Sequence, residues 1–280
     1  MNSLRIQRGV VDRIRKVVEN RSNLGPITLF LGAKTAFFGR GEREHKKIMK
    51  NEHDHFNDPN TLFGKLRAAC ADEWDSYCYH EFVRGIGAGT LPEECFRHYL
   101  EQDYLFLIHF SRAWALAVYK SDTLADMRAA TSTLDAILNY EMELHVKYCA
   151  GWGLKEQEME RANEAKANMA YTRYVLERGL AGDVLDLHVA LAPCVIGYAV
   201  IGKNLASDPT TKFEGNPYKD WIEMYSGEEF QNVAKAAVRH LDELGTSRLG
   251  PGRFENLVKT FRQATILEIG FWDMGLNLQF

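Results

Sequence analysis

The sequence predicts an all-α fold, a bundle of helices. From Thr61 onward, apolar side chains recur at intervals of three and four residues, the spacing that places them on one face of a helix. Outside Ile27–Phe30 we find no convincing alternation of apolar and polar residues, the pattern of a half-buried strand, and no internal repeat. Helices that each carry one apolar face bury it against one another, so a bundle is the expected architecture.

The polar segment Asn51–Asn60, which contains several turn formers, divides the chain into two regions. Residues 1–60 hold 12 Lys and Arg against 7 Asp and Glu, a net charge of +5, which leaves −9 for the rest of a chain of net charge −4. We therefore expect an N-terminal extension at 1–60 and a helical domain at 61–280. A basic arm can bind nucleic acid, but here acidic residues are mixed in and no aromatic platform accompanies the bases. This favours a solvated arm and no nucleic-acid partner.

The first helical face is expected between Phe63 and Phe82, and it ends at the glycine-rich connector Gly85–Gly89. The connector lacks the spacing and the preceding strand of a phosphate-binding loop. The next helix begins near Thr90, which can cap it, and runs through Trp114. Later helices are expected at 124–149, 165–182, 185–205, 217–225, 226–244 and 254–278.

Composition excludes several classes of protein. A chain of 280 residues with 46% hydrophobic content can bury a substantial core. Its five cysteines form no Cys-x-x-Cys pair, which argues against a disulfide framework or a zinc ribbon and favours a reducing compartment. No stretch approaches the roughly 18 to 20 apolar residues of a membrane span, and the N-terminus lacks the apolar region of a secretion signal. We expect a soluble, cytoplasmic protein with no membrane partner.

Carboxylate-rich helical bundles often hold two metal ions, ligated by Glu-x-x-His from each of two helices. That spacing occurs only in the polar N-terminal region, at Glu42/His45 and Glu52/His55. Glu141 and His145 lie one helical turn apart but out of register for the motif, so an exposed or capping ion pair is their expected role. The sequence therefore predicts no metal site and no cofactor.

Three residues are candidates for chemistry. Asp103 shares the aromatic stripe of its helix, and an interior carboxylate must be paired or hydrogen-bonded. Cys194 lies one helical turn before Tyr198. A buried free cysteine usually packs as a small hydrophobic side chain. It can act as a nucleophile if its position is fixed and a neighbour stabilises the thiolate or accepts its proton. Glu268 stands among apolar residues of the last helix, where its pKa should rise to values useful for proton transfer. From the residues alone, structural roles stay open for all three.

Seven short motifs occur in order: Phe82–Pro92 (FVRGIGAGTLP), Tyr99–Tyr104 (YLEQDY), Glu141–His145 (EMELH), Ala170–Thr172 (AYT), Leu191–Cys194 (LAPC), Trp221–Tyr225 (WIEMY), and Glu268 with Phe271–Trp272. Together they closely resemble the TenA (thiaminase II) family of the haem-oxygenase-like superfold, over about residues 66–278. The resemblance does not reach the N-terminal extension.

The resemblance implies a cytoplasmic homotetramer of all-helical subunits without a cofactor. It also implies hydrolysis of aminopyrimidine breakdown products of thiamin, with thiamin itself as a further candidate substrate, to release 4-amino-5-hydroxymethyl-2-methylpyrimidine for thiamin salvage. Carried over by motif, Cys194 would add to the pyrimidine ring, Glu268 would protonate the leaving group, and Asp103 would hydrogen-bond the amidine-like edge of the ring. The remaining substrate-site residues would be Phe106, Tyr171, Tyr198 and Tyr225.

Phe106 departs from the family pattern. Several members have a tyrosine at this position, with its hydroxyl on the nucleophilic sulfur, and a phenyl ring cannot form that hydrogen bond. Either another group activates Cys194 or its reactivity is lower. Two alternatives stay open: a same-fold hydrolase acting on another amine, and a non-catalytic pyrimidine-binding or regulatory protein. The second is disfavoured because both proposed chemical residues are retained.

Overall fold

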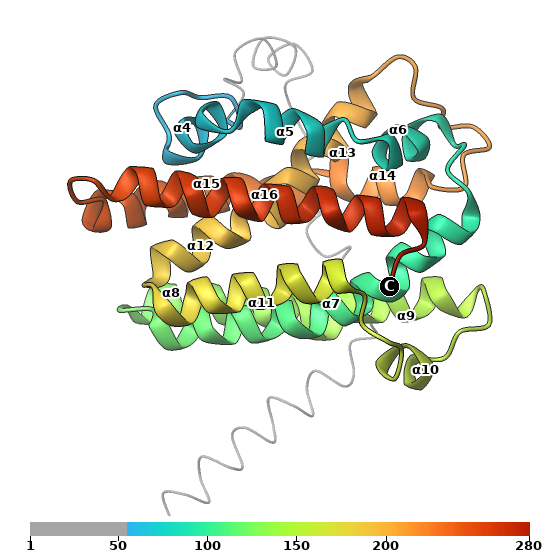
Figure 1. Cartoon of the computed structure of the whole chain (residues 1–280), viewed down its shortest axis with the longest axis horizontal. Helices are drawn as coiled ribbons and strands as arrows, with labels where there is room; N and C mark the ends of the chain where they lie inside the picture. Colours follow the sequence, from blue (N-terminus) through green and yellow to red (C-terminus); the bar gives the residue numbers. More distant parts are fainter. Residues whose placement is uncertain (1–54) are drawn as a thin grey trace, which may run out of the picture. The chain divides into compact units, whose positions relative to one another are not determined.

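The computed structural model describes residues 55–280, and this part of the chain contains helices and no strand, which confirms the all-α prediction (Figure 1). The elements are α4 (Leu62–Ala69), α5 (Ala71–Cys78), α6 (Glu81–Ala88), α7 (Glu93–Lys120), α8 (Leu124–Ala136), η1 (Ile137–Glu141), α9 (Met142–Ala150), α10 (Glu156–Glu160), α11 (Lys166–Ala181), α12 (Val184–Ala192), η2 (Pro193–Gly197), α13 (Tyr198–Ser207), α14 (Lys219–Ser226), α15 (Glu228–Arg248) and α16 (Arg253–Asn277). The η elements are π-helical turns inside longer helices. The predicted extension, including Ile27–Phe30, lies outside the described residues except for 55–60.

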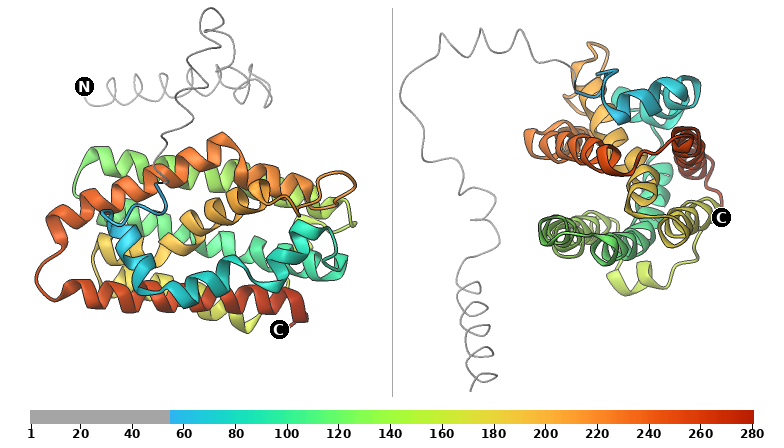
Figure 2. Two further views of the ribbon diagram at one scale, coloured as in Figure 1. Left: turned by 90° about the horizontal axis from the view of Figure 1, so that it is seen from above. Right: turned by 90° about the vertical axis from the view of Figure 1, so that its left-hand side faces the viewer.

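The helices form two groups on either side of α12. In Figures 1 and 2, α7, α8 and α11 lie together on one side and α15 and α16 on the other. The contacts agree, since α12 packs against α11, α15, α16 and α7. Side chains of α12 such as Leu185 and Val189 are fully buried. The helix that leads into Cys194 is therefore the central helix of the bundle.

This central helix corrects one prediction. The continuous segment Val184–Ser207 (α12, η2 and α13) is long and apolar enough to cross a membrane by length and composition, although we expected no such stretch. In this fold, 83% of its apolar window is buried. A helix enclosed on all sides by other helices is apolar all round, so its composition is similar to that of a membrane-spanning helix.

The region before α7 also differs from the prediction. The single helix expected over Phe63–Phe82 is three short helices, because the backbone breaks at Cys70 and again before α6, where the His80 side chain caps the helix. The glycine-rich segment is mostly the end of α6. A β-carbon at Gly87 would lie 2.8 Å from the Leu205 side chain, so this glycine allows α6 to pack closely on α13. Thr90 caps no helix, since α7 begins after Pro92.

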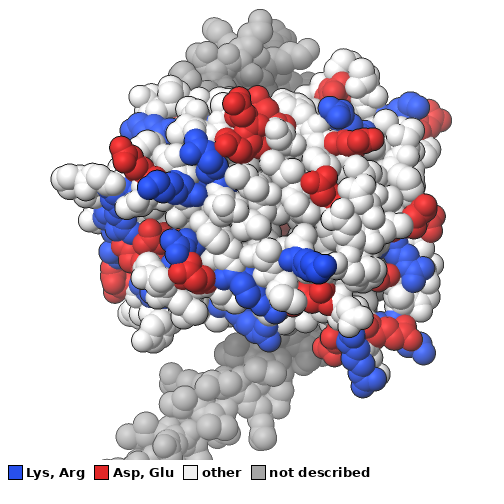
Figure 3. Space-filling view, viewed as in Figure 1, with Lys and Arg blue, Asp and Glu red and all other residues white. Residues whose placement is uncertain are grey.

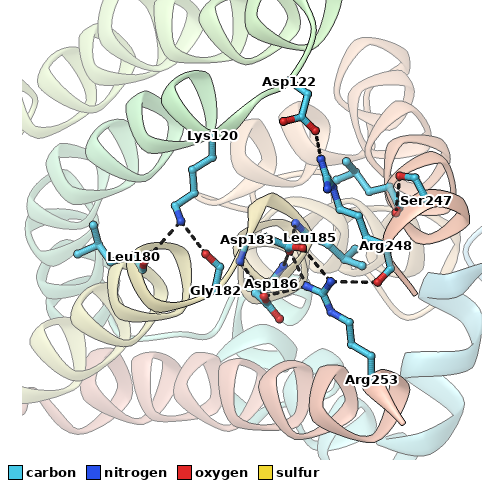
Figure 4. Close-up of polar contacts among 11 residues, drawn as sticks. Lys120, Asp122, Leu180, Gly182, Asp183, Leu185, Asp186, Ser247, Arg248 and Arg253 are labelled. Atoms are coloured by element: carbon cyan, nitrogen blue, oxygen red, sulfur yellow. Dashed lines mark hydrogen bonds and ion pairs between the residues drawn. The ribbon is translucent and has the colours of Figure 1, made fainter. Parts of the chain in front are cut away.

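An ion-pair cluster fixes the start of α12 at one end of the bundle (Figure 4). The Asp183 side chain caps α12 by accepting from the backbone N–H groups of its first turn. Arg253, at the start of α16, donates to Asp183 and, at 2.9 Å, to Asp186. Lys120, at the end of α7, donates to the carbonyl oxygen of Gly182 at 2.6 Å. The cluster therefore ties α7 and α16 to the first turn of the central helix.

Candidate active site

The structure brings the seven predicted site residues together from six elements, and none of them is more than 9% exposed. They are Asp103 and Phe106 on α7, Tyr171 on α11, Cys194 on η2, Tyr198 on α13, Tyr225 on α14 and Glu268 on α16. The Phe106 and Tyr171 rings stack with centroids 5.4 Å apart, and those of Tyr198 and Tyr225 lie 4.9 Å apart. These residues lie around η2, where α12 passes into α13.

Cys194 lies in η2, the π-helical turn that interrupts the central helix. Pro193 begins this turn and has no N–H to donate, which favours the departure from regular α-helical bonding. The thiol donates to the carbonyl oxygen of Leu191 at 3.1 Å. Burial raises the pKa of the thiol well above its usual value and the charge of Glu268 raises it further, whereas a hydrogen bond with Tyr171 lowers it. At rest the thiol is therefore neutral.

Glu268 carries the second reactive group. Its carboxyl is almost fully buried and accepts a hydrogen bond of 2.8 Å from the Tyr171 hydroxyl. Burial raises the pKa of Glu268 to about 8; the Tyr171 hydrogen bond opposes this rise and the charge of Asp103 adds to it. At neutral pH the carboxyl is mostly protonated, which is the form that can donate a proton to a leaving group.

Phe106 has no hydroxyl to offer Cys194, but Tyr171 places a hydroxyl among the reactive groups. Its hydroxyl donates to Glu268 at 2.8 Å, and Tyr171 also lowers the pKa of the Cys194 thiol, so this residue acts on both the acid and the nucleophile. Phe106 instead lies against the Tyr171 ring and against Phe271, with ring centroids 5.8 Å apart in the second pair. Position 106 therefore offers no hydroxyl, and Tyr171 on α11 provides the one that contacts Glu268.

Asp103 is paired inside the fold, as the sequence required. Its Oδ2 lies 2.6 Å from Nε2 of His145, and Nδ1 of His145 lies 2.9 Å from the carbonyl oxygen of Glu141. Burial alone would lower the pKa of His145, but the hydrogen bond and charge of Asp103 raise it to about 9. Burial raises the pKa of Glu141 to about 7, against the charge of His145.

The expected exposed or capping ion pair between Glu141 and His145 is therefore wrong. His145 is buried, and its carboxylate partner is Asp103, on another helix. Spacing along one helix identified the i, i+4 neighbour, but it carries no information about a partner 42 residues away in the chain. The EMELH motif was the only sequence signal for this contact.

Tyr77 is a site residue that the sequence reasoning missed. Its hydroxyl donates to the carbonyl oxygen of Pro193 at 3.3 Å, at the first residue of η2. A β-carbon at Gly197 would lie 2.4 Å from the Tyr77 ring, so only glycine leaves room for this contact. Tyr77 and Gly197 together hold the π-helical turn that presents the thiol.

Within residues 55–280 no group of three or more His, Cys, Asp or Glu side chains is arranged to hold a metal ion. The two Glu-x-x-His pairs named above lie outside the described residues, except for His55. The chemistry available in the described site is that of a thiol, a protonated carboxyl and a carboxylate paired with a histidine.

Comparison with known proteins identifies relatives over the same region. The profile of the TENA/THI-4/PQQC family matches residues 67–278. An uncharacterized protein of Haemophilus influenzae is 43% identical over 205 residues, 73% of this chain and 94% of its own length. The aminopyrimidine aminohydrolase of Halalkalibacterium halodurans is 36% identical over 207 residues, 73% of this chain and 90% of its own length.

Solved structures agree with the fold. A crystal structure from Silicibacter, described as a TenA family transcription regulator, matches with a TM-score of 0.74 at 47% identity, over 79% of this chain and 98% of its own. A protein of Shewanella denitrificans with a heme oxygenase-like fold matches with a TM-score of 0.59 at 13% identity, over 76% of this chain and 91% of its own, which bears on the fold alone. The predicted haem-oxygenase-like helical bundle is confirmed.

Proposed function

The chain belongs to the TENA/THI-4/PQQC family, and on that premise we propose that it is an aminopyrimidine aminohydrolase of the thiaminase II type that acts by cysteine addition. Aminopyrimidine aminohydrolases of Halalkalibacterium halodurans and Helicobacter pylori, each 36% identical to this chain, support the activity. The observation that carries the mechanism is the burial of the Cys194 thiol close to Glu268, whose carboxyl accepts a hydrogen bond of 2.8 Å from Tyr171.

The first step is addition of the Cys194 S–H group across a C=N bond of the pyrimidine ring, with sulfur bonding to carbon and the proton passing to ring nitrogen. Because burial keeps the thiol neutral, this step requires an electrophilic ring and a local hydrogen-bond partner for the sulfur. The Tyr171 hydroxyl, which lowers the pKa of the thiol, takes this role when its hydrogen turns from Glu268 to the sulfur. Addition removes the aromaticity of the ring and prepares the exocyclic C–N bond for cleavage.

In the second step the C–N bond breaks and the amine leaves with the proton of Glu268. Water then adds to the exposed methylene and returns a proton to Glu268, and expulsion of the Cys194 thiol restores the aromatic ring. A carboxyl with a pKa of about 8 is suited to both transfers near neutral pH. The product is the hydroxymethylpyrimidine that thiamin salvage requires.

Recognition of the pyrimidine falls to Asp103 and the surrounding rings. A carboxylate accepts two hydrogen bonds, which matches the amino group and adjacent ring nitrogen of a protonated aminopyrimidine. Phe106, Tyr171, Tyr198 and Tyr225 would enclose the flat ring and hold it against the thiol. Binding at this site needs no cofactor.

We also propose a cytoplasmic homotetramer whose helical domain, 61–280, follows a separate N-terminal extension, 1–60. All five cysteines are free thiols, which supports a reducing compartment. Exposed apolar side chains on the outer surface of the α8–α9 helix, Leu124, Leu138 and Leu144, support association between subunits. On the face shown in Figure 3, charges of both signs are interspersed, which supports a small-molecule rather than a nucleic-acid partner.

The proposal is tested by incubating the full-length protein with aminomethylpyrimidine, with intact thiamin and with a panel of unrelated amines, and measuring released hydroxymethylpyrimidine by chromatography. We expect turnover of aminomethylpyrimidine, and the ratio to thiamin turnover separates salvage from thiamin degradation. Turnover of an unrelated amine alone would favour the same-fold hydrolase. Tight pyrimidine binding without any turnover would favour the non-catalytic binder.

A further inference from the structure

The Asp103–His145 pair joins two helices inside the proposed pyrimidine site. The structure points to a role for this histidine in pyrimidine binding, which rests on the proposed function. Asp103 comes from α7 and His145 from α9, both side chains are buried, and their 2.6 Å contact is among the shortest polar contacts in the described structure. A buried pair of this kind is retained where its geometry is good and its remaining polar atoms can bond to protein, water or a ligand.

The positions of the protons follow from the partners of the two ring nitrogens. Nδ1 of His145 faces the carbonyl oxygen of Glu141, which only accepts, so Nδ1 carries a hydrogen. Nε2 faces Oδ2 of Asp103. If Asp103 is ionised, its oxygen also only accepts, and Nε2 must carry a second hydrogen. His145 is then an imidazolium that neutralises the buried carboxylate.

The backbone favours this arrangement. Glu141 ends the π-helical turn η1, in which the N–H of Met142 bonds to the carbonyl oxygen of Ile137 five residues earlier. The extra residue of a π-turn rotates the following helix about its axis, and here the following helix carries His145. Such turns are frequent at functional sites, and the second one in the described chain carries Cys194.

The pair leaves one carboxylate oxygen uncommitted. Oδ2 of Asp103 is bonded to His145, while Oδ1 accepts no hydrogen bond from any of residues 55–280. We propose that His145 is a positioning residue: as an imidazolium held between Asp103 and the Glu141 carbonyl, it binds Oδ2 of Asp103 and fixes Oδ1 toward the donor edge of an aminopyrimidine. The charged groups that face His145 are Asp103 from α7 and Glu141 from η1.

The first test is spectroscopic and uses the unmodified chain. In full-length protein labelled with ¹⁵N-histidine, both ring nitrogens of His145, assigned from the signals missing in His145→Gln, should be protonated at pH 7 and at pH 8. This agrees with its pKa of about 9. An unprotonated ring nitrogen at pH 7 would place the shared proton on Asp103 and overturn the proposal.

The second test separates positioning from folding. Glutamine at position 145 can keep a donor toward Asp103 but removes the charge, so His145→Gln should raise the dissociation constant for hydroxymethylpyrimidine about tenfold while saturating turnover falls less than about threefold. In an Asp103→Asn background the same change should have no further effect on binding. Unchanged pyrimidine affinity in His145→Gln would contradict the proposal.

His80→Gln is the matched control. His80 forms a histidine–carboxylate pair of 3.2 Å with Asp273 outside the site, and its loss should leave pyrimidine affinity unchanged. If the wild type turned over no aminopyrimidine, the proposed function would fail, but the nitrogen spectrum and the pyrimidine affinity would still decide the role of His145.

Discussion

Replacing Glu268 with glutamine should abolish turnover and, at the same time, stabilise the protein as the pH rises. The carboxyl is almost fully buried, so the folded state favours its neutral form over its charged form. In the unfolded chain the same group ionises near its ordinary value of 4.5. Above that pH, ionisation of the carboxyl lowers the free energy of the unfolded state but not that of the folded state, so the protein becomes less stable. Glutamine does not ionise, and the variant therefore lacks this destabilisation.

The magnitude follows from the two pKa values. Because the folded-state pKa of about 8 lies above the unfolded value of 4.5, the relative advantage of the folded wild type is greatest below pH 4.5 and declines as pH rises toward 8. At about 1.4 kcal/mol per pH unit, the decline reaches about 3 kcal/mol at pH 7 and about 5 kcal/mol above pH 8. The amide oxygen of glutamine can still accept from Tyr171, so the main hydrogen bond is retained.

The assay is urea unfolding of wild type and Glu268→Gln at equal protein concentration from pH 5 to pH 9, followed by circular dichroism. The difference in unfolding free energy should grow in favour of the variant up to about pH 8 and then level off. Glu255→Gln, an exposed change on the same helix, is the matched control and should show only a small, pH-independent difference. A flat difference for Glu268→Gln would refute the reasoning that burial holds this carboxyl neutral.

Three further predictions concern the surroundings of the site. Tyr171→Phe removes the hydrogen bond that lowers the pKa of Glu268, so the alkaline limb of the pH–rate profile should move to higher pH while kcat falls about tenfold or more. An alkaline limb at the wild-type pH would contradict the effect of Tyr171 on Glu268. Arg253→Gln removes the ion pairs to the first turn of α12 and should lower the free energy of unfolding by about 1–2 kcal/mol with KM unchanged, and undiminished stability would show the clamp to be unimportant. Gly197→Ala places a methyl group 2.4 Å from the Tyr77 ring and should cost about 1–3 kcal/mol of stability and reduce kcat by displacing η2; wild-type kinetics would show that the turn tolerates the shift.

Regular helices were predictable from the sequence because their signal is local. Apolar spacing located α7, α11, α15 and α16 to within a few residues, since each buries one continuous face. The breaks at Cys70 and before α6 were not predictable in this way, because the apolar period runs on through them. Neither were the π-helical turns, which insert a residue without interrupting the pattern.

The site residues show the same distinction between local sequence signals and contacts between distant helices. Local sequence context singled out Cys194 and Glu268, and the family motifs then gave them their expected roles. The buried position of Glu268 agrees with the raised pKa expected of an acid among apolar residues. Contacts between distant helices could not be predicted from the sequence: Asp103 with His145, and the Tyr171 hydroxyl with Glu268. These contacts depend on how α7, α9, α11 and α16 are placed by the whole fold, which spacing along one helix does not encode.

The most direct test of the central claim compares wild type with Cys194→Ser on aminomethylpyrimidine, measuring ammonia release together with hydroxymethylpyrimidine affinity. If Cys194 adds to the ring, the serine variant should lose at least about a thousandfold in kcat while its pyrimidine affinity stays within about threefold, because an alcohol is a far weaker nucleophile of nearly the same size. Turnover by Cys194→Ser at a rate near that of the wild type would contradict the account, since the reaction would then proceed without the thiol.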